Sequence, residues 1–240
     1  MHYKIFFAVT FFLMSLTNLD LKETTKTNPE LTASAKTAFD VKAEGIYAQL
    51  NANNFAMPAI ASFKQALEGF YSLKEKGMIE KDILTLVDFS LSSKVKRLWV
   101  IDLTTNTILF NSLVAHGRNS GMEFANSFSN KNESLKSSLG LYLTGEVYNG
   151  KHGMSLKLDG QESGVNSNAR SRSVVMHGAD YVSESVVKMQ NRLGRSLGCP
   201  AIPVELTDDI INTIKGKSAF FIYHPSRAKK TYGSFTHSVV

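Results

Sequence analysis

The apolar positions of the chain change from a helical spacing to short β-type runs near residue 83. Over residues 58–76 they recur every three or four residues, which is the spacing of a helix with one buried face. Pro58 suits the first turn of this helix and Gly77 suits its C-terminal cap. A weaker helical pattern covers residues 40–50. We therefore predict two helices in succession, and the stronger one needs a surface to pack on.

Beyond residue 83, short runs rich in β-branched and aromatic residues are separated by turn residues. The expected strands are 84–89, 97–103, 107–115, 139–148, 154–158, 173–176 and 219–223. Two helices are expected among them, at 183–190 and 207–215, the second with Thr207 as its N-cap. Many short strands with few helices predict a mainly β fold with added helices (α+β), a barrel or sandwich that follows an N-terminal helical segment.

The N-terminus has the pattern of an export signal. Lys4 precedes an apolar run over 5–16, which is too short for a membrane-spanning helix of about 20 residues but matches the core of a secretory signal. We interpret 1–17 as a signal peptide or uncleaved signal anchor and 18–38 as a polar linker. An exported protein of the periplasm or cell envelope is expected, with membrane contact only through that anchor.

The remaining boundaries follow from the change of pattern. The helical segment is assigned to 39–80, the β-rich domain to 81–225 and a C-terminal tail to 226–240. A hydrophobic content of 43% with 20% charged residues is typical of a folded protein with a sizeable core.

The charge of the chain limits its partners. The net charge of +6 favours an anionic partner, yet no run of Lys or Arg is longer than two residues, which argues against nucleic acid. An acidic cell-wall polymer fits this charge equally well. The six histidines lack the spacings of common zinc motifs, so we expect neither a metal nor a cofactor.

Cys199 is the only cysteine, so it cannot form an intramolecular disulfide. A lone thiol is either a buried apolar filler or a reactive group. Gly198 and Pro200 predict a tight, irregular turn around it rather than the middle of a helix. In an exported protein a free thiol is exposed to oxidation, which favours a chemical use for it.

His177 follows the predicted strand 173–176 and is the candidate partner of this thiol. An imidazole can take the thiol proton and return it to a leaving amine. The backbone carbonyl of Gly178 is a candidate acceptor for the other ring nitrogen. Backbone N–H groups in the turn of Gly198 and Cys199 are candidates for an oxyanion hole.

Two segments carry a resemblance to a known family. His177-Gly178-Ala179, followed by Arg192-Leu193-Gly194-Arg195-Ser196-Leu197-Gly198-Cys199-Pro200, resembles the murein L,D-transpeptidase (YkuD-type) catalytic domain, in the branch with an HGA…GRSxGCP motif. The resemblance covers roughly residues 55–225. Further matching segments are Asp88-Phe89-Ser90, 96–102, Ala115-His116-Gly117, Asn119-Ser120-Gly121 and Gly150-Lys151-His152-Gly153.

The resemblance implies a β-rich fold and acyl transfer on peptidoglycan stem peptides. Cys199 would attack the L-centre carbonyl of diaminopimelate in a stem tetrapeptide and expel D-alanine. An amine from a neighbouring stem would then resolve the acyl-enzyme and leave a 3→3 cross-link. With water as the acceptor, the same protein would be an L,D-carboxypeptidase.

The chain also departs from the wider family, which commonly reads Ser-His-Gly-Cys followed closely by Arg. Here Leu197 stands in place of that histidine, so a catalytically silent cell-wall-binding module is a further alternative. The order of His before Cys disagrees with papain-like hydrolases, and the missing Arg disagrees with sortases. The candidate substrate contacts are His116, His152, Arg192, Arg195 and Ser196, although both histidines also have a structural interpretation. We expect a monomer.

Overall fold

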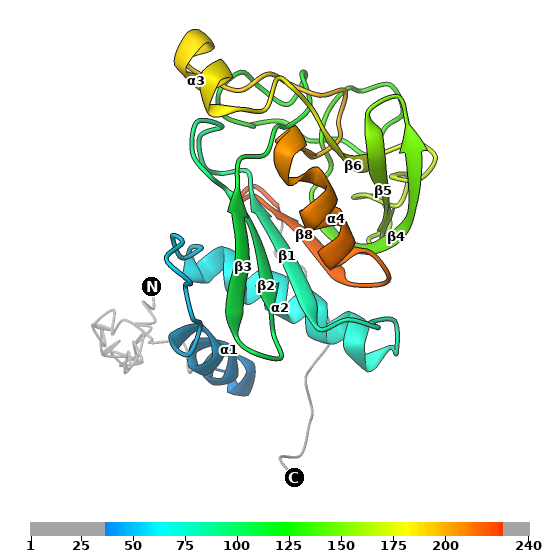
Figure 1. Ribbon diagram of the computed structural model, residues 1–240. Helices are drawn as coiled ribbons and strands as arrows, with labels where there is room; N and C mark the ends of the chain where they lie inside the picture. Colours follow the sequence, from blue (N-terminus) through cyan, green and yellow to red (C-terminus); the bar gives the residue numbers. More distant parts are fainter. Residues whose placement is uncertain (1–36, 228–240) are drawn as a thin grey trace, which may run out of the picture. The chain divides into compact units, whose positions relative to one another are not determined.

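The computed structural model describes residues 37–227 (Figure 1). The predicted signal or anchor over 1–17, nearly all of the predicted linker over 18–38 and residues 228–240 of the predicted tail lie outside the described residues. The described helices are α1 (Ala38–Ala48), α2 (Ile60–Glu75), α3 (Glu184–Gln190), the 3₁₀ turn η1 (Val204–Leu206) and α4 (Thr207–Ile214). The strands are β1 (Ile83–Asp88), β2 (Leu98–Asp102), β3 (Thr107–Ser112), β4 (Gly140–Gly150), β5 (Gly153–Gly160), β6 (Val175–Gly178), β7 (Ala201–Ile202) and β8 (Ala219–Tyr223).

All eight of these strands belong to one sheet with the order β3-β2-β1-β8-β4-β5-β6-β7. β1 runs parallel to β8 and β6 runs parallel to β7, while the other neighbours are antiparallel. The two edge strands of the sheet are β3 and β7. Just after β3, Ala115 forms an isolated bridge to Ala201 of β7, and its N–H donates to the Ala201 carbonyl at 2.8 Å. The sheet is therefore nearly closed, like a barrel.

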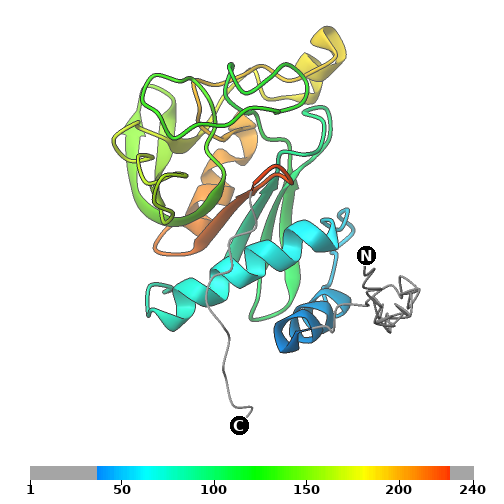
Figure 2. The ribbon, with the colours of Figure 1, turned by 180° about the vertical axis from the view of Figure 1, so that it is seen from behind.

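Side chains of the central strands alternate between two hydrophobic cores, as the period of two in a strand requires. In β1, Leu84 and Leu86 face the core that includes α2, whereas Val87 faces the core that includes α4. β8 follows the same rule, with Phe221 on the α2 side and Phe220 on the α4 side. Figure 2 shows α2 lying across the back of the strands.

Helices α2 and α4 cover opposite faces of the sheet with buried apolar side chains. Phe63, Leu67 and Phe70 of α2 are buried against the sheet. Complete burial of a side chain of this size contributes about 1.5–3 kcal/mol relative to exposure. Ile210 and Ile214 of α4 fill the opposite core. No helix within residues 37–227 is long and apolar enough to cross a membrane.

The mixed α+β fold and the seven predicted strands are confirmed, with boundaries that shift by a few residues. β7 was not predicted, because its two residues are too short for a pattern. The prediction of Thr207 as an N-cap is wrong, since the N-cap residue of α4 is Leu206. The 3₁₀ turn η1 runs directly into α4, so Thr207 is already helical and its hydroxyl donates to the carbonyl of Pro203 at 3.0 Å.

Candidate functional site

Strand β6 brings the thiol and the imidazole to one edge of the sheet. β6 pairs with β7 in parallel, with His177 opposite Ala201. Extending this pairing back by two residues places Cys199 beside Val175, and the hydrogen bonds agree. The backbone N–H of Val175 donates to the Cys199 sulfur at 3.4 Å, and the thiol donates to the carbonyl of Ser173 at 3.6 Å. Cys199 therefore lies against the strand that carries His177 two residues further on.

The ring of His177 is buried and has one defined hydrogen bond. Its Nδ1 lies 2.8 Å from the carbonyl oxygen of Gly178, so Nδ1 carries the proton and Nε2 is left as the basic nitrogen. Burial lowers the pKa of His177, and the charge of Lys151 lowers it further, while the bond to Gly178 opposes them. The imidazole is thus neutral and able to accept a proton near pH 7. Its hydrogen bond is the contact that the sequence predicted for Gly178.

The thiol and the imidazole do not bond each other directly within the described part of the chain, where the sulfur contacts β6 instead. Removal of the sulfur from water raises the pKa of the Cys199 thiol. The N–H of Val175 and the charges of Arg172 and Lys151 act in the opposite direction. The resting site therefore contains a neutral thiol and a neutral imidazole.

The turn that carries Cys199 is held by two buried serine hydroxyls. Ser196 Oγ donates to the carbonyl of Cys199 at 2.6 Å and accepts from the N–H of Gly198 at 3.0 Å. Ser137 Oγ donates to the carbonyl of Gly198 at 3.1 Å and accepts from the N–H of Gly117 at 3.0 Å. Gly198 has a φ of 132°, a conformation that side chains rarely adopt. The turn is a rigid support for the sulfur.

This network bears on the predicted oxyanion hole. The N–H of Gly198 is already bonded to Ser196 Oγ. The N–H of Cys199 has no hydrogen-bond partner among residues 37–227. Of the two backbone donors in this turn, that of Cys199 is therefore the one free to bind a developing oxyanion.

Arg172 is a part of the site that sequence reasoning missed. One terminal nitrogen of its guanidinium donates to the carbonyl of Lys136 at 2.7 Å and the other to the carbonyl of Ser129 at 2.7 Å. The guanidinium also lies 3.5 Å from the place where a Cβ on Gly198 would be. A fixed positive charge thus lies next to the turn that carries Cys199. The sequence analysis looked for an arginine just after the cysteine, whereas Arg172 lies before the strand that carries His177. A search for a basic residue before that strand could have identified Arg172.

The remaining predicted substrate contacts differ in how accessible they are. His116 is buried, its Nδ1 accepts from Arg97 at 2.8 Å, and burial together with the Arg97 charge lowers its pKa to about 4. These contacts support its structural interpretation. Ser196 is used within the turn, Arg192 donates to the carbonyl of Leu193 and Arg195 donates to the carbonyl of Arg118.

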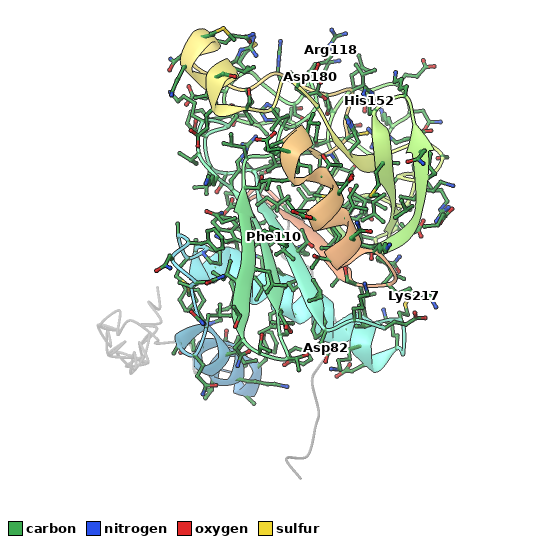
Figure 3. All side chains as sticks on the ribbon, in the orientation of Figure 1. Asp82, Phe110, Arg118, His152, Asp180 and Lys217 are labelled. Atoms are coloured by element: carbon green, nitrogen blue, oxygen red, sulfur yellow. The ribbon has the colours of Figure 1, made fainter. Side chains whose placement is uncertain are left out.

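His152 is the predicted residue that comes nearest to the imidazole. Its exposed ring stacks on His177, with ring centroids 4.4 Å apart and an angle of 20° between the planes. Figure 3 shows His152 at the same end of the molecule as Arg118 and Asp180. Leu197, which stands where the wider family has histidine, is 59% exposed. Within residues 37–227, His, Cys, Asp and Glu side chains form no group of three that could hold a metal ion.

Known proteins are similar to this chain both in a sequence profile and among solved structures. The sequence profile of a family described as "L,D-transpeptidase catalytic domain" matches residues 56–223, well over half of the chain. No curated protein matches in sequence. Among solved structures, an L,D-transpeptidase from Mycobacterium smegmatis is similar at 10% identity and a TM-score of 0.37, with 60% of this chain and 59% of that chain covered.

The helical cell shape determining protein Pgp2 from Campylobacter jejuni is similar at 13% identity and a TM-score of 0.40, with 68% of this chain and 58% of that chain covered. This chain thus spans less than two thirds of the length of either structure. Similarity at this level carries no inference about substrate.

Proposed function

Because this chain belongs to the L,D-transpeptidase catalytic domain family, we propose that it is an exported cysteine acyltransferase that remodels peptidoglycan in the periplasm or cell envelope. The donor is a stem tetrapeptide and the nucleophile is Cys199. The proposal rests above all on the contact of the Cys199 sulfur with the strand that carries His177.

In the first half-reaction, Nε2 of His177 takes the proton of the thiol and the sulfur attacks the L-centre carbonyl of diaminopimelate. A C–S bond forms, and negative charge develops on the carbonyl oxygen, which the N–H of Cys199 stabilises. The tetrahedral intermediate collapses when the amide C–N bond breaks. His177 gives its proton to the leaving nitrogen, and D-alanine departs with a free amine.

In the second half-reaction, the side-chain amine of a neighbouring stem attacks the thioester. His177 accepts a proton from this amine as the new C–N bond forms, and the C–S bond breaks. The sulfur leaves as a thiolate and recovers its proton from the imidazolium. The product is a 3→3 cross-link, and water in place of the amine would yield a tripeptide.

The electrostatics of the site support this chemistry. A neutral imidazole can act as a base, which a protonated one cannot. The Arg172 guanidinium favours the thiolate, since opposite charges stabilise the ionised form. The hydrogen bond to Gly178 keeps the proton on Nδ1. The dyad therefore starts uncharged and becomes an ion pair only as the reaction proceeds.

The test is an incubation of purified tetrapeptide-containing muropeptides with wild type, Cys199→Ala and His177→Gln, read by mass spectrometry. We expect 3→3 dimers with the wild type and no dimers with Cys199→Ala. His177→Gln should lower the initial rate by about 10²–10⁴-fold, the usual contribution of a general base. Tripeptides alone would indicate a carboxypeptidase. Product formation by Cys199→Ala, or an inactive wild type that binds peptidoglycan, would overturn the proposal.

A further inference from the structure

The β4–β5 hairpin brings a second histidine onto the candidate base. Gly150 pairs with Gly153, so the loop of the hairpin consists of Lys151 and His152 alone. Ser155, just beyond the loop in β5, pairs with His177 in β6. This register carries the loop over the edge of β6, where the rings of His152 and His177 stack with centroids 4.4 Å apart.

The stacked pair has one buried and one exposed member. His177 is only 4% exposed, whereas His152 lies at the exposed tip of the hairpin. The ring of His152 therefore covers a face of the imidazole that would otherwise contact water. Stacked rings at this separation are in attractive contact, which also restricts rotation of the inner ring.

We propose that His152 is a positioning residue for His177: its ring covers one face of the imidazole, excludes water from that face and keeps the ring in the plane set by the Gly178 carbonyl. This inference rests on the proposed function, in which His177 is the base. His152 touches neither the sulfur nor the reacting carbonyl in this arrangement, so its effect passes through His177.

The charges near His177 set the direction of the expected effect. Burial lowers the pKa of His177 most and the bond to Gly178 raises it, while His152 and Lys151 of the hairpin loop lower it further. The charge of Arg172 acts on the Cys199 thiol rather than on the imidazole, and the phenol of Tyr181 is likewise coupled to Cys199. Loss of the covering ring would let water reach the imidazolium, which water stabilises. The pKa of His177 should therefore rise.

The test is an NMR titration of the His177 ring in the full chain carrying Cys199→Ala, which removes any coupled titration of the thiol. We expect His152→Ala to raise the midpoint by about half to one pH unit. His152→Phe retains an aromatic ring that can stack on His177. Its midpoint should therefore shift by no more than about a third as much as that of His152→Ala. His224→Ala is the matched control, because the ring of His224 contacts Phe128 in a tilted pair instead, and its loss should leave the His177 midpoint unchanged.

Equal midpoints in the Cys199→Ala chain with and without His152→Ala would overturn the inference, as would equal shifts in the Ala and Phe variants at position 152. In the active enzyme, the acid limb of kcat/KM should move upward in His152→Ala and remain near its wild-type position in His152→Phe, since the neutral imidazole is the active form. An NMR shift without turnover in the wild type would support the positioning role and refute the proposed function. Turnover without an NMR shift would support the proposed function and refute the positioning role of His152.

Discussion

Two segments that reach the candidate dyad are built in opposite ways. The turn over residues 196–199, which carries Cys199, is tied to its surroundings by the hydroxyls of Ser196 and Ser137. The hairpin loop of Lys151 and His152 is exposed and touches the site through a ring contact. One segment carries the sulfur of the proposed nucleophile, and the other covers the ring of the proposed base.

Of the two segments, the one with the buried hydrogen bonds is the turn that carries Cys199. A nucleophile gains rate from a fixed distance and angle to the carbonyl, and buried hydrogen bonds provide that fixed geometry. An exposed loop with few contacts is stabilised less by its surroundings, so it should tolerate substitution better than the turn. Changes in the turn should accordingly cost more than changes in the hairpin loop.

The largest effect is expected from Gly117→Ala. A Cβ at this position would lie 2.6 Å from the carbonyl oxygen of Leu135, 2.9 Å from the backbone nitrogen of Ser137 and 3.0 Å from Cα of Gly198. All three are backbone atoms, so the supporting segments themselves must shift. We expect a loss of about 3 kcal/mol in unfolding free energy, measured by urea denaturation, and a loss of most activity. A stable, fully active Gly117→Ala protein would show that the turn is not rigid.

A smaller effect should follow from Ser196→Ala. This change leaves the carbonyl of Cys199 and the N–H of Gly198 without their partner. Unsatisfied buried groups of this kind cost about 1–3 kcal/mol each, and we expect about 2 kcal/mol together with at least a tenfold loss of kcat. Ser171→Ala is the control, because the exposed hydroxyl of Ser171 bonds only the carbonyl of Asn168. Similar losses in both variants would contradict a special role for Ser196.

Arg172→Met should lower the reactivity of the Cys199 thiol. Burial raises the pKa of Cys199 and the Arg172 charge lowers it, so removal of this charge should raise the pKa further. Less thiolate is then present at pH 8, and iodoacetamide labelling of Cys199 should slow about three- to tenfold.

Arg170→Met is the matched control for that measurement. Arg170 is two residues away, but its guanidinium pairs with Glu146 and Asp159 on the surface. Its loss should leave the labelling rate of Cys199 unchanged. Equal slowing in both variants would mean that the charge of Arg172 has no specific effect on the pKa of the Cys199 thiol.

Much of this site was predictable because local sequence determines it. The turn of Cys199 was predicted from its neighbours Gly198 and Pro200. The bond from His177 to the carbonyl of Gly178 was predicted from the position of His177 at the end of a strand. The same reasoning could not distinguish a structural role of His116 from a substrate contact, because His116 also follows a predicted strand and precedes a glycine. Only the fold reveals that His116 is buried against Arg97.

Other parts depend on contacts between distant residues, for which the sequence has no pattern. Ser137 bonds the carbonyl of Gly198, 61 residues away along the chain. Arg172 bonds the carbonyl of Lys136, 36 residues away. The bridge between Ala115 and Ala201 that nearly closes the sheet is of the same kind. Such contacts follow from the path of the whole chain, so strand patterns predicted the sheet but not the network behind the cysteine.

The smallest effect is expected from Gly153→Ala at the hairpin. Gly153 has a φ of 73°, so an alanine there is strained, but its Cβ would have no atom within 4 Å. The cost should be only the strain of a left-handed residue, about 1 kcal/mol in unfolding free energy. Activity should fall less than threefold, because the turn that carries Cys199 is untouched. A loss as large as that of Gly117→Ala, measured side by side, would mean that the hairpin loop is as rigid as the turn and would remove the contrast between them.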